Sequence, residues 1–278
     1  MLLMNDGRSI PLRNLSRALG GKIDDVYFSD NPNVFTIFGK LNKTVLVLAD
    51  FMSCVYYYNY KISGKPKFFF KWIVYEIIER VLYRRLKKVI IQTNFEIKHS
   101  QRIGLNNTFK LTNYVKRSER LRKPRRKSDI IKVGIIATFD NIYSIQTATL
   151  IKLLHQSESS KIELLLAGKG SDKFEGQHGV TVLGVVADLS DFYDAIDVAA
   201  CISWKGYGFI NKLAESISRR CPVVCNLSAL NEMEFLKDSP AVMLVNSDLD
   251  VLDYDSLTKF IDRNKDLKFL NSANEKIQ

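Results

Sequence analysis

Apolar residues form short continuous stretches along residues 128–278, and these stretches alternate with segments of helical period. The apolar stretches predict strands at residues 132–138, 162–167, 180–185, 197–203, 222–226 and 241–245. Helices are predicted near residues 144–155, 189–195 and 209–219. Continuous runs rich in valine and isoleucine are typical of strands buried on both faces. The pattern therefore predicts an α/β fold with a parallel, doubly wound sheet.

The first half of the chain is also α/β in pattern, but it is less regular. Strands are predicted at residues 26–28, 34–38, 44–49 and 89–92, and a long helix at 69–86. In parallel α/β sheets the loops after the strands and the helix N-termini meet at one edge, where ligands bind. We therefore look for binding residues directly after the predicted strands.

Positive charge is concentrated in the first half. The chain has 278 residues with 41 Lys+Arg against 30 Asp+Glu, and residues 1–127 hold 26 of the former and 9 of the latter. Eight basic residues and one acid, interrupted by Pro124, fill residues 116–127. This predicts an N-terminal domain at 1–115, a basic linker at 116–128 and a C-terminal domain at 129–278. The asymmetry indicates a polyanionic surface as partner of the N-terminal domain.

Composition narrows the class of protein. Hydrophobic residues make up 46% and charged residues 26% of the chain, which is typical of globular proteins and excludes disordered and collagenous classes. The four cysteines show no C-x2-C spacing, so we expect buried reduced thiols and no metal site. We expect no signal peptide in residues 1–12, a stretch that is short and interrupted by Asp6 and Arg8, and no run of the sequence is long enough for a membrane helix. We expect a cytoplasmic protein.

Two glycine-containing loops follow predicted strands. Gly206 and Gly208 precede a predicted helix that carries Lys212 and Glu215, and Gly168 and Gly170 follow the strand at 162–167. Glycines let the backbone approach a ligand, and a helix N-terminus suits a diphosphate. Lys212 can balance phosphate charge and Glu215 can accept hydrogen bonds from ribose hydroxyls. Tight turns with solvated charged side chains would show the same pattern.

At this point the order of the segments resembles a known family, the GT-B glycosyltransferases of glycosyltransferase family 4, or group 1. The shared order is a strand ending in A-G-x-G at 167–170, the segment 182–198, a glycine-rich loop at 206–208, K-L-x-E at 212–215 and P-V-V at 222–224. Residues 83–93 resemble the helix and strand that precede the linker in that family. The resemblance covers about residues 44–246 and implies two Rossmann-like domains facing a cleft.

The resemblance implies a nucleotide-sugar donor bound by the C-terminal domain, by residues of the two loops and the helix. These residues are Gly168, Gly170, Lys205, Gly206, Tyr207, Gly208, Lys212 and Glu215. Glu215 matches the second glutamate of the family's E-x7-E motif, whereas Tyr207 stands at the position of the first. The family's cation after the first strand is missing from residues 138–143. Either Lys212, Lys205 or Lys169 replaces it, or the donor chemistry has changed or been lost.

The family's enzymes usually work without a bound metal, and this chain has no D-x-D motif beside a strand. No cofactor is therefore expected apart from the donor substrate. Asp50, which ends the strand at 44–49, is the N-terminal carboxylate best placed to act as base toward the acceptor. A loop or capping aspartate would look the same in sequence.

Residues 65–75 contain three phenylalanines and a tryptophan beside three lysines, and four tyrosines lie within 56–60. Apolar rings flanked by lysines suit the interface of an anionic membrane, although rings in a core beside solvated lysines would give the same composition. No DNA- or RNA-binding motif accompanies the positive charge, so a nucleic-acid partner is disfavoured.

These observations predict a glycosyltransferase that adds a sugar to a surface polysaccharide or a lipid-linked glycan, at the inner face of the membrane. The alternative is a non-catalytic relative that binds a nucleotide or a partner transferase subunit. The usual first strand and glycine-rich acceptor loop are not visible before Leu12. We therefore expect a shortened N-terminal domain, as in a trimmed form, an incomplete product or a subunit that needs a partner. The residues after Asp248 are expected to form a helix that crosses back to the N-terminal domain.

Overall fold

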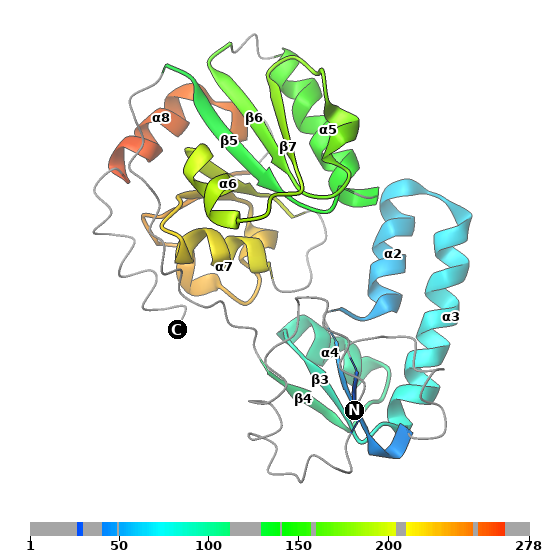
Figure 1. Cartoon of the computed structure of the whole chain (residues 1–278). Coiled ribbons are helices and arrows are strands. Elements are labelled where there is room, and N and C mark those ends of the chain that lie inside the picture. The colour runs from blue at the N-terminus through cyan, green and yellow to red at the C-terminus, as the bar shows by residue number, and fades with distance from the viewer. Residues whose placement is uncertain are drawn as a thin grey trace. The chain divides into compact units, whose positions relative to one another are not determined.

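The computed structural model describes residues 27–29, 41–48, 50–111, 129–139, 141–156, 160–203, 210–246 and 250–264. The chain divides into two compact units, one N-terminal and one C-terminal (Figure 1). The expected linker at 116–128 and the predicted strand at 34–38 lie outside the described residues.

Four described strands form a parallel sheet in the N-terminal unit, in the order β1-β2-β3-β4. They are β1 (Tyr27–Ser29), β2 (Thr44–Val47), β3 (Lys88–Ile91) and β4 (Thr108–Lys110). The two central strands are buried along most of their length, which explains why their sequences are continuous apolar runs.

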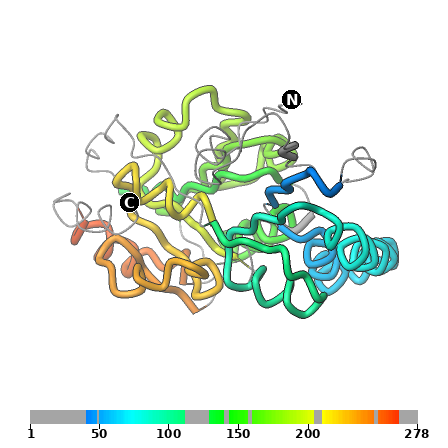
Figure 2. The backbone as a smooth tube through the Cα atoms, turned by 90° about the horizontal axis from the view of Figure 1, so that it is seen from below, coloured from blue at the N-terminus to red at the C-terminus, as the bar shows by residue number. Residues whose placement is uncertain are grey.

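Three helices join these strands: α2 (Met52–Ser63), α3 (Pro66–Leu82) and α4 (Asn94–Arg102). The turn between the first two is built by Gly64, whose φ of 64° ends α2, and by Pro66 in the first turn of α3. Helices α2 and α3 lie side by side as a hairpin in both views (Figures 1 and 2). The 3₁₀ turn η3 (Tyr83–Arg85) leads from α3 into β3.

The described C-terminal unit contains a parallel sheet of six strands, in the order β10-β9-β8-β5-β6-β7. These are β5 (Ile131–Ile136), β6 (Ile162–Ala167), β7 (Val180–Gly184), β8 (Val198–Cys201), β9 (Val223–Cys225) and β10 (Val242–Leu244). The chain runs outward from β5 to β7 and returns to β8 on the other side of β5. The strand order therefore reverses between β5 and β8, and such a switch point opens a crevice at the carboxyl ends of the strands.

The helices of this unit are α5 (Asn141–Gln156), α6 (Leu189–Ala195), α7 (Asn211–Ser218) and α8 (Tyr254–Arg263). Short 3₁₀ helices are η4 (Ser171–Phe174), η5 (Leu227–Leu230), η6 (Glu234–Leu236) and η7 (Asp250–Leu252). Helix α8 packs Leu257, Phe260 and Ile261 into the core of the C-terminal unit. The crossing back to the N-terminal domain expected of the residues after Asp248 is thus not made by α8, and for the residues after 264, which lie outside the described part, it stays a prediction.

The predicted α/β class and parallel sheets are confirmed in both units. Observed β6 and α6 have the predicted bounds, and the other C-terminal strands differ from the predicted ones by at most two residues at either end. The long helix predicted at 69–86 begins earlier, at Pro66, because proline suits a first helical turn, and it ends at Leu82. Helices α2 and α4 and strand β4 were not predicted.

Candidate functional site

A small hollow with a cavity volume of about 20 Å³ lies in the C-terminal unit where the strand order reverses. The ends of β5 and β8 form its floor, α5 forms one wall, and Ile210 and Lys212 at the start of α7 form another. The lining residues are Ile135, Ile136, Tyr143, Gln146, Thr147, Leu150, Ala200, Cys201, Ile202, Ile210 and Lys212. An apolar hollow with a few polar groups at a switch point is the usual place for a nucleotide in such folds.

Polar groups of this hollow point to a ligand. Gln146 is 4% exposed, and its amide Nε2 has no hydrogen-bond partner among the described residues. Ser203, just beyond the end of β8, does not line the hollow; it is equally buried, and its Oγ also lacks a partner in the described part of the chain. Because an unpaired buried polar group costs about 1–3 kcal/mol, the Gln146 amide would gain from a hydrogen-bonding molecule bound in the hollow.

Lys212 is the cation of the hollow. Its Nζ lies 3.8 Å from the centroid of the Tyr143 ring on α5, which holds the ammonium against the opposite wall. Of the three lysines proposed for the diphosphate, the structure places Lys212 in the lining. Lys169 is exposed after β6, and Lys205 lies outside the described residues, with Gly206, Tyr207 and Gly208.

Glu215 lies on α7, one turn after Lys212, and does not line the hollow. Its Oε1 accepts hydrogen bonds from Nε and Nη2 of Arg219, each at 3.2 Å. Arg219 also donates from Nη1 to the Ser190 hydroxyl at 2.9 Å and lies over the Tyr193 ring. The carboxylate therefore has a built-in partner, and its proposed ribose contact remains a prediction.

The loop with Gly168 and Gly170 approaches the loop after β5 very closely. A Cβ on Gly168 would lie 2.0 Å from the Ala137 carbonyl oxygen, and φ is +121° at Gly168 and +80° at Gly170. These two glycines are thus required by the backbone itself. The same loop carries Lys173, whose Nζ donates a hydrogen bond to the Phe139 carbonyl. This contact brings a cation to the end of β5, and the sequence pattern did not indicate it.

At the carboxyl edge of the N-terminal sheet, Asp50 follows β2 and Glu96 belongs to the first turn of α4. Glu96 Oε2 accepts from the backbone N–H of Gln92 and Thr93 at 2.8 and 2.9 Å, while the Thr93 hydroxyl accepts from Glu96 N–H. This is a capping box. Burial raises the pKa of Glu96 to about 7, and the charge of Asp50 adds to the shift. The base role of Asp50 stays a prediction.

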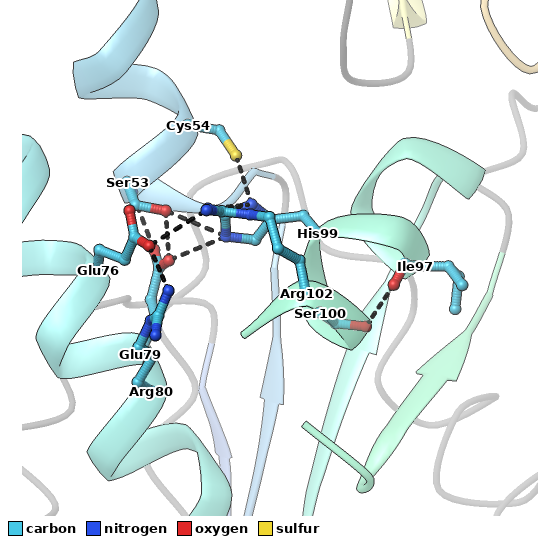
Figure 3. Close-up of polar contacts among 9 residues, drawn as sticks. All are labelled: Ser53, Cys54, Glu76, Glu79, Arg80, Ile97, His99, Ser100 and Arg102. Atoms are coloured by element: carbon cyan, nitrogen blue, oxygen red, sulfur yellow. Dashed lines mark hydrogen bonds and ion pairs between the residues drawn. The ribbon is translucent and has the colours of Figure 1, made fainter. Parts of the chain in front are cut away.

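A second group of polar residues, which the sequence did not reveal, joins α2, α3 and α4 (Figure 3). Glu79 accepts from both the backbone N–H and the hydroxyl of Ser53, and its Oε2 lies 3.3 Å from Nε2 of His99. Arg102 Nη2 and Cys54 Sγ each lie 3.3 Å from Nδ1 of His99. Since arginine only donates, Nδ1 accepts and Nε2 carries the hydrogen that Glu79 receives.

All five residues of this cluster except Arg102 are buried. Ser53 and Glu79 are 0% exposed, and Cys54 and His99 are 7% exposed. Burial raises the pKa of the Cys54 thiol to about 12, so this cysteine is not a nucleophile at neutral pH. The cluster fastens the three helices to one another.

The four cysteines are all buried free thiols, as expected. Burial also raises the pKa of Cys201, in the floor of the hollow, to about 12. Within the described ranges no three His, Cys, Asp or Glu side chains gather as a metal site requires. None of the described helices is long and apolar enough to span a bilayer.

The sequence match to a known protein family lies in the C-terminal unit, which holds the hollow. Residues 127–250 match the family model of glycosyl transferases group 1. This matched segment, which is under half of the chain, is similar to a group 1 glycosyltransferase domain. The resemblance expected from the sequence is confirmed for this part of the chain. No curated protein is significantly similar to the chain in sequence.

Among solved structures, TarM of S. aureus covers 95% of this chain at 17% identity with a TM-score of 0.62. HepE of Anabaena, in complex with UDP-glucose, covers 91% at 15% identity with a TM-score of 0.61. WaaG, a glycosyltransferase involved in lipopolysaccharide biosynthesis, covers 96% at 14% identity with a TM-score of 0.58. The chain spans 53% of TarM, 77% of HepE and 80% of WaaG. These similarities show the fold, which is GT-B with a partial N-terminal domain.

Proposed function

We propose that this protein transfers a sugar from a nucleotide-sugar donor to a surface-polysaccharide or lipid-linked glycan acceptor. The observation that carries the proposal is the hollow at the switch point of a group 1 domain, with the Lys212 ammonium in its wall and the unpaired Gln146 amide inside it. HepE, which has a similar fold, was solved with UDP-glucose bound, and this supports a nucleotide-sugar donor here.

In the proposed reaction an acceptor hydroxyl attacks the anomeric carbon of the donor sugar. The bond from that carbon to the diphosphate oxygen breaks, and the nucleoside diphosphate leaves with the bonding electrons. Lys212 stabilises the charge that develops on the diphosphate, and Glu215 holds the ribose. Asp50 accepts the hydroxyl proton. We propose that this transfer needs no metal and no cofactor besides the donor.

We place this activity in the cytoplasm, at the inner face of the cell membrane, where a lipid-linked acceptor is available. The acidic remainder of the chain and the absence of a nucleic-acid-binding motif make nucleic acid an unsuitable partner. The test is incubation with a panel of nucleotide sugars and measurement of nucleotide release, with Glu215→Ala alongside. Turnover that falls in this variant supports the proposal.

A second candidate is a non-catalytic relative that binds a nucleotide and supports a partner transferase subunit. Tyr207 at the position of the first family glutamate, and the lack of a cation in residues 138–143, favour it. Thermal stabilisation by nucleoside diphosphates, without turnover of any nucleotide sugar, would select this second function.

A further inference from the structure

The outer face of helix α3 is apolar and exposed. Phe70 is 65% exposed, and four aliphatic side chains further along the helix are 40–57% exposed. We call these five residues the α3 stripe: Phe70, Ile73, Val74, Ile77 and Val81. Their spacing of three and four residues places them on one side of the helix, along about 17 Å of its length at a rise of about 1.5 Å per residue. Five adjacent exposed apolar side chains are unusual for a surface helix.

The opposite side of α3 packs against α2 through aromatic rings. The ring centroids of Tyr56 on α2 and Tyr75 on α3 lie 5.1 Å apart, and those of Tyr57 on α2 and Trp72 on α3 also lie 5.1 Å apart. The C-terminal end of α3 reaches the core of the N-terminal unit through Ile78 and Leu82. The aromatic residues that the sequence singled out are therefore divided. Most of them join the two helices, and Phe70 points to the outside.

Cations flank the α3 stripe. Lys67 and Lys71 lie on α3 beside Phe70, and Arg80 lies beside Val81; all three are exposed. Lys67 and Lys71 lie over the rings of Phe68 and Tyr56, at 5.0 and 5.1 Å, which holds their stems along the helix.

The two acids of α3, Glu76 and Glu79, point toward residues of α2 and α4 (Figure 3). Glu79 is fully buried against Ser53 and His99, and Glu76 is paired with Arg80 at 2.8 Å and Arg102 at 3.3 Å. Residues 41–111 contain thirteen Lys and Arg against four Asp and Glu. None of those four acids is exposed, whereas all but one of the cations are.

We propose that the α3 stripe and its flanking cations dock the protein on an anionic lipid bilayer. This inference rests on the proposed function, because a lipid-linked acceptor lies at such a surface. Apolar side chains enter the boundary between headgroups and acyl chains, and the cations meet lipid phosphates at the same level. A nucleic acid would match the charge but would gain nothing from five apolar side chains. A second copy of this surface would bring like charges together.

The test is flotation of the full chain with phosphatidylcholine vesicles, with and without added phosphatidylglycerol. We expect binding only with the anionic lipid, and weaker binding at high salt. The triple variant Ile73→Ser, Val74→Ser, Ile77→Ser should lower the partition coefficient at least tenfold. Lys67→Ala and Lys71→Ala should each lower it about fivefold. All these side chains are exposed, so the melting temperature should stay unchanged.

The matched control is the pair Val185→Ser and Leu227→Ser, two apolar side chains of the C-terminal unit that are 77% and 63% exposed. They should float like the wild type. The proposal is overturned if neutral vesicles bind equally well, if the triple variant floats like the wild type, or if the control pair loses binding to the same extent. Self-association abolished by the triple variant, or oligonucleotide binding without vesicle binding, would equally overturn it. Nucleotide release measured without vesicles tests the donor reaction separately, so either proposal can fail while the other stands.

Discussion

Arg219 donates two hydrogen bonds to a single oxygen of Glu215, Oε1, and so leaves Oε2 outside the pair. Arg219 is itself held by the Ser190 hydroxyl, so the carboxylate is fixed in one orientation on α7. A carboxylate held by one oxygen can still receive hydrogen bonds at the other. The pair therefore orients Glu215 through Oε1 and does not use Oε2.

This pair leads to a first prediction. Glu215→Ala should weaken the binding of a nucleotide sugar by about 10- to 100-fold, because hydrogen bonds to a charged group contribute about 1.5–3 kcal/mol. Isothermal titration calorimetry measures this affinity, with the nucleotide sugar from which the wild type releases nucleotide. Glu175→Ala, an exposed glutamate of the same unit, is the control and should bind normally. Equal binding by Glu215→Ala and wild type would remove Glu215 from the site.

The position of Lys212 leads to a second prediction. Lys212→Met should weaken nucleoside diphosphate binding at least tenfold, since its ammonium lines the hollow and no other lysine does in the described part of the chain. Lys169→Met should change the affinity less than about twofold, because exposed charge contributes little. Fluorescence titration with nucleoside diphosphates compares the two. The reverse order of effects would assign the diphosphate to the loop after β6.

Gln146 allows a prediction in which stability and binding change in opposite directions. Gln146→Leu removes a buried donor that has no partner among the described residues, so the free protein should become more stable by about 1 kcal/mol. The same change should weaken donor binding, because the ligand loses the amide. Thermal melts with and without nucleoside diphosphate measure both effects. A variant that is less stable and binds normally would show that the amide serves the fold.

The cluster around Glu79 predicts a large effect on stability. Glu79→Ala should lower the free energy of unfolding by about 3–5 kcal/mol, because Ser53 and His99 lose a buried partner. Glu76→Ala, on the same helix, removes only partly exposed ion pairs and should cost less than about 1 kcal/mol. Urea denaturation of both variants measures the difference, and equal costs would contradict the role of the cluster.

Glu96 predicts a dependence of stability on pH. Its folded pKa of about 7 lies above the ordinary value of 4.5, so the folded state keeps a proton that the unfolded state has lost between these values. The free energy of unfolding should therefore fall as pH rises from about 4.5 to 7, by up to about 3 kcal/mol. Glu96→Gln should flatten this slope. Asp50→Asn should reduce it in part, because it removes the charge that adds to the shift. Urea denaturation across this pH range measures it, and an unchanged slope in Glu96→Gln would assign the effect to another group.

The sequence predicted the C-terminal sheet well because its central strands, β5, β6, β8 and β9, are buried along most of their length. Runs such as residues 198–201 and 223–225 have no polar position to confuse a strand with an amphipathic helix. Helix α2 was missed because tyrosines occupy several of its faces, so its sequence shows no clear helical period. Helix α4 is short, and the signal that would have found it is the capping box of Thr93 and Glu96.

The candidate site could be predicted only in part. Glycine pairs after strands and the K-L-x-E segment were visible, because they are local patterns. Lys173, the unpaired Gln146 amide and the cluster around Glu79 gave no local signal. Ser53 and His99, for example, are 46 residues apart in the chain and meet only because α2 and α4 flank the same sheet.

By itself, the sequence determined the α/β class, the group 1 resemblance and the concentration of positive charge in the first half, since periodicity, motif order and composition are properties of the chain. Only the tertiary structure decided which residues face one another. The reversal of strand order between β5 and β8 brings Lys212 to Tyr143, and the packing of α3 turns Glu76 and Glu79 inward while its apolar stripe faces out. The periodicity of a helix shows which residues share a face, but the neighbouring elements determine which face is buried.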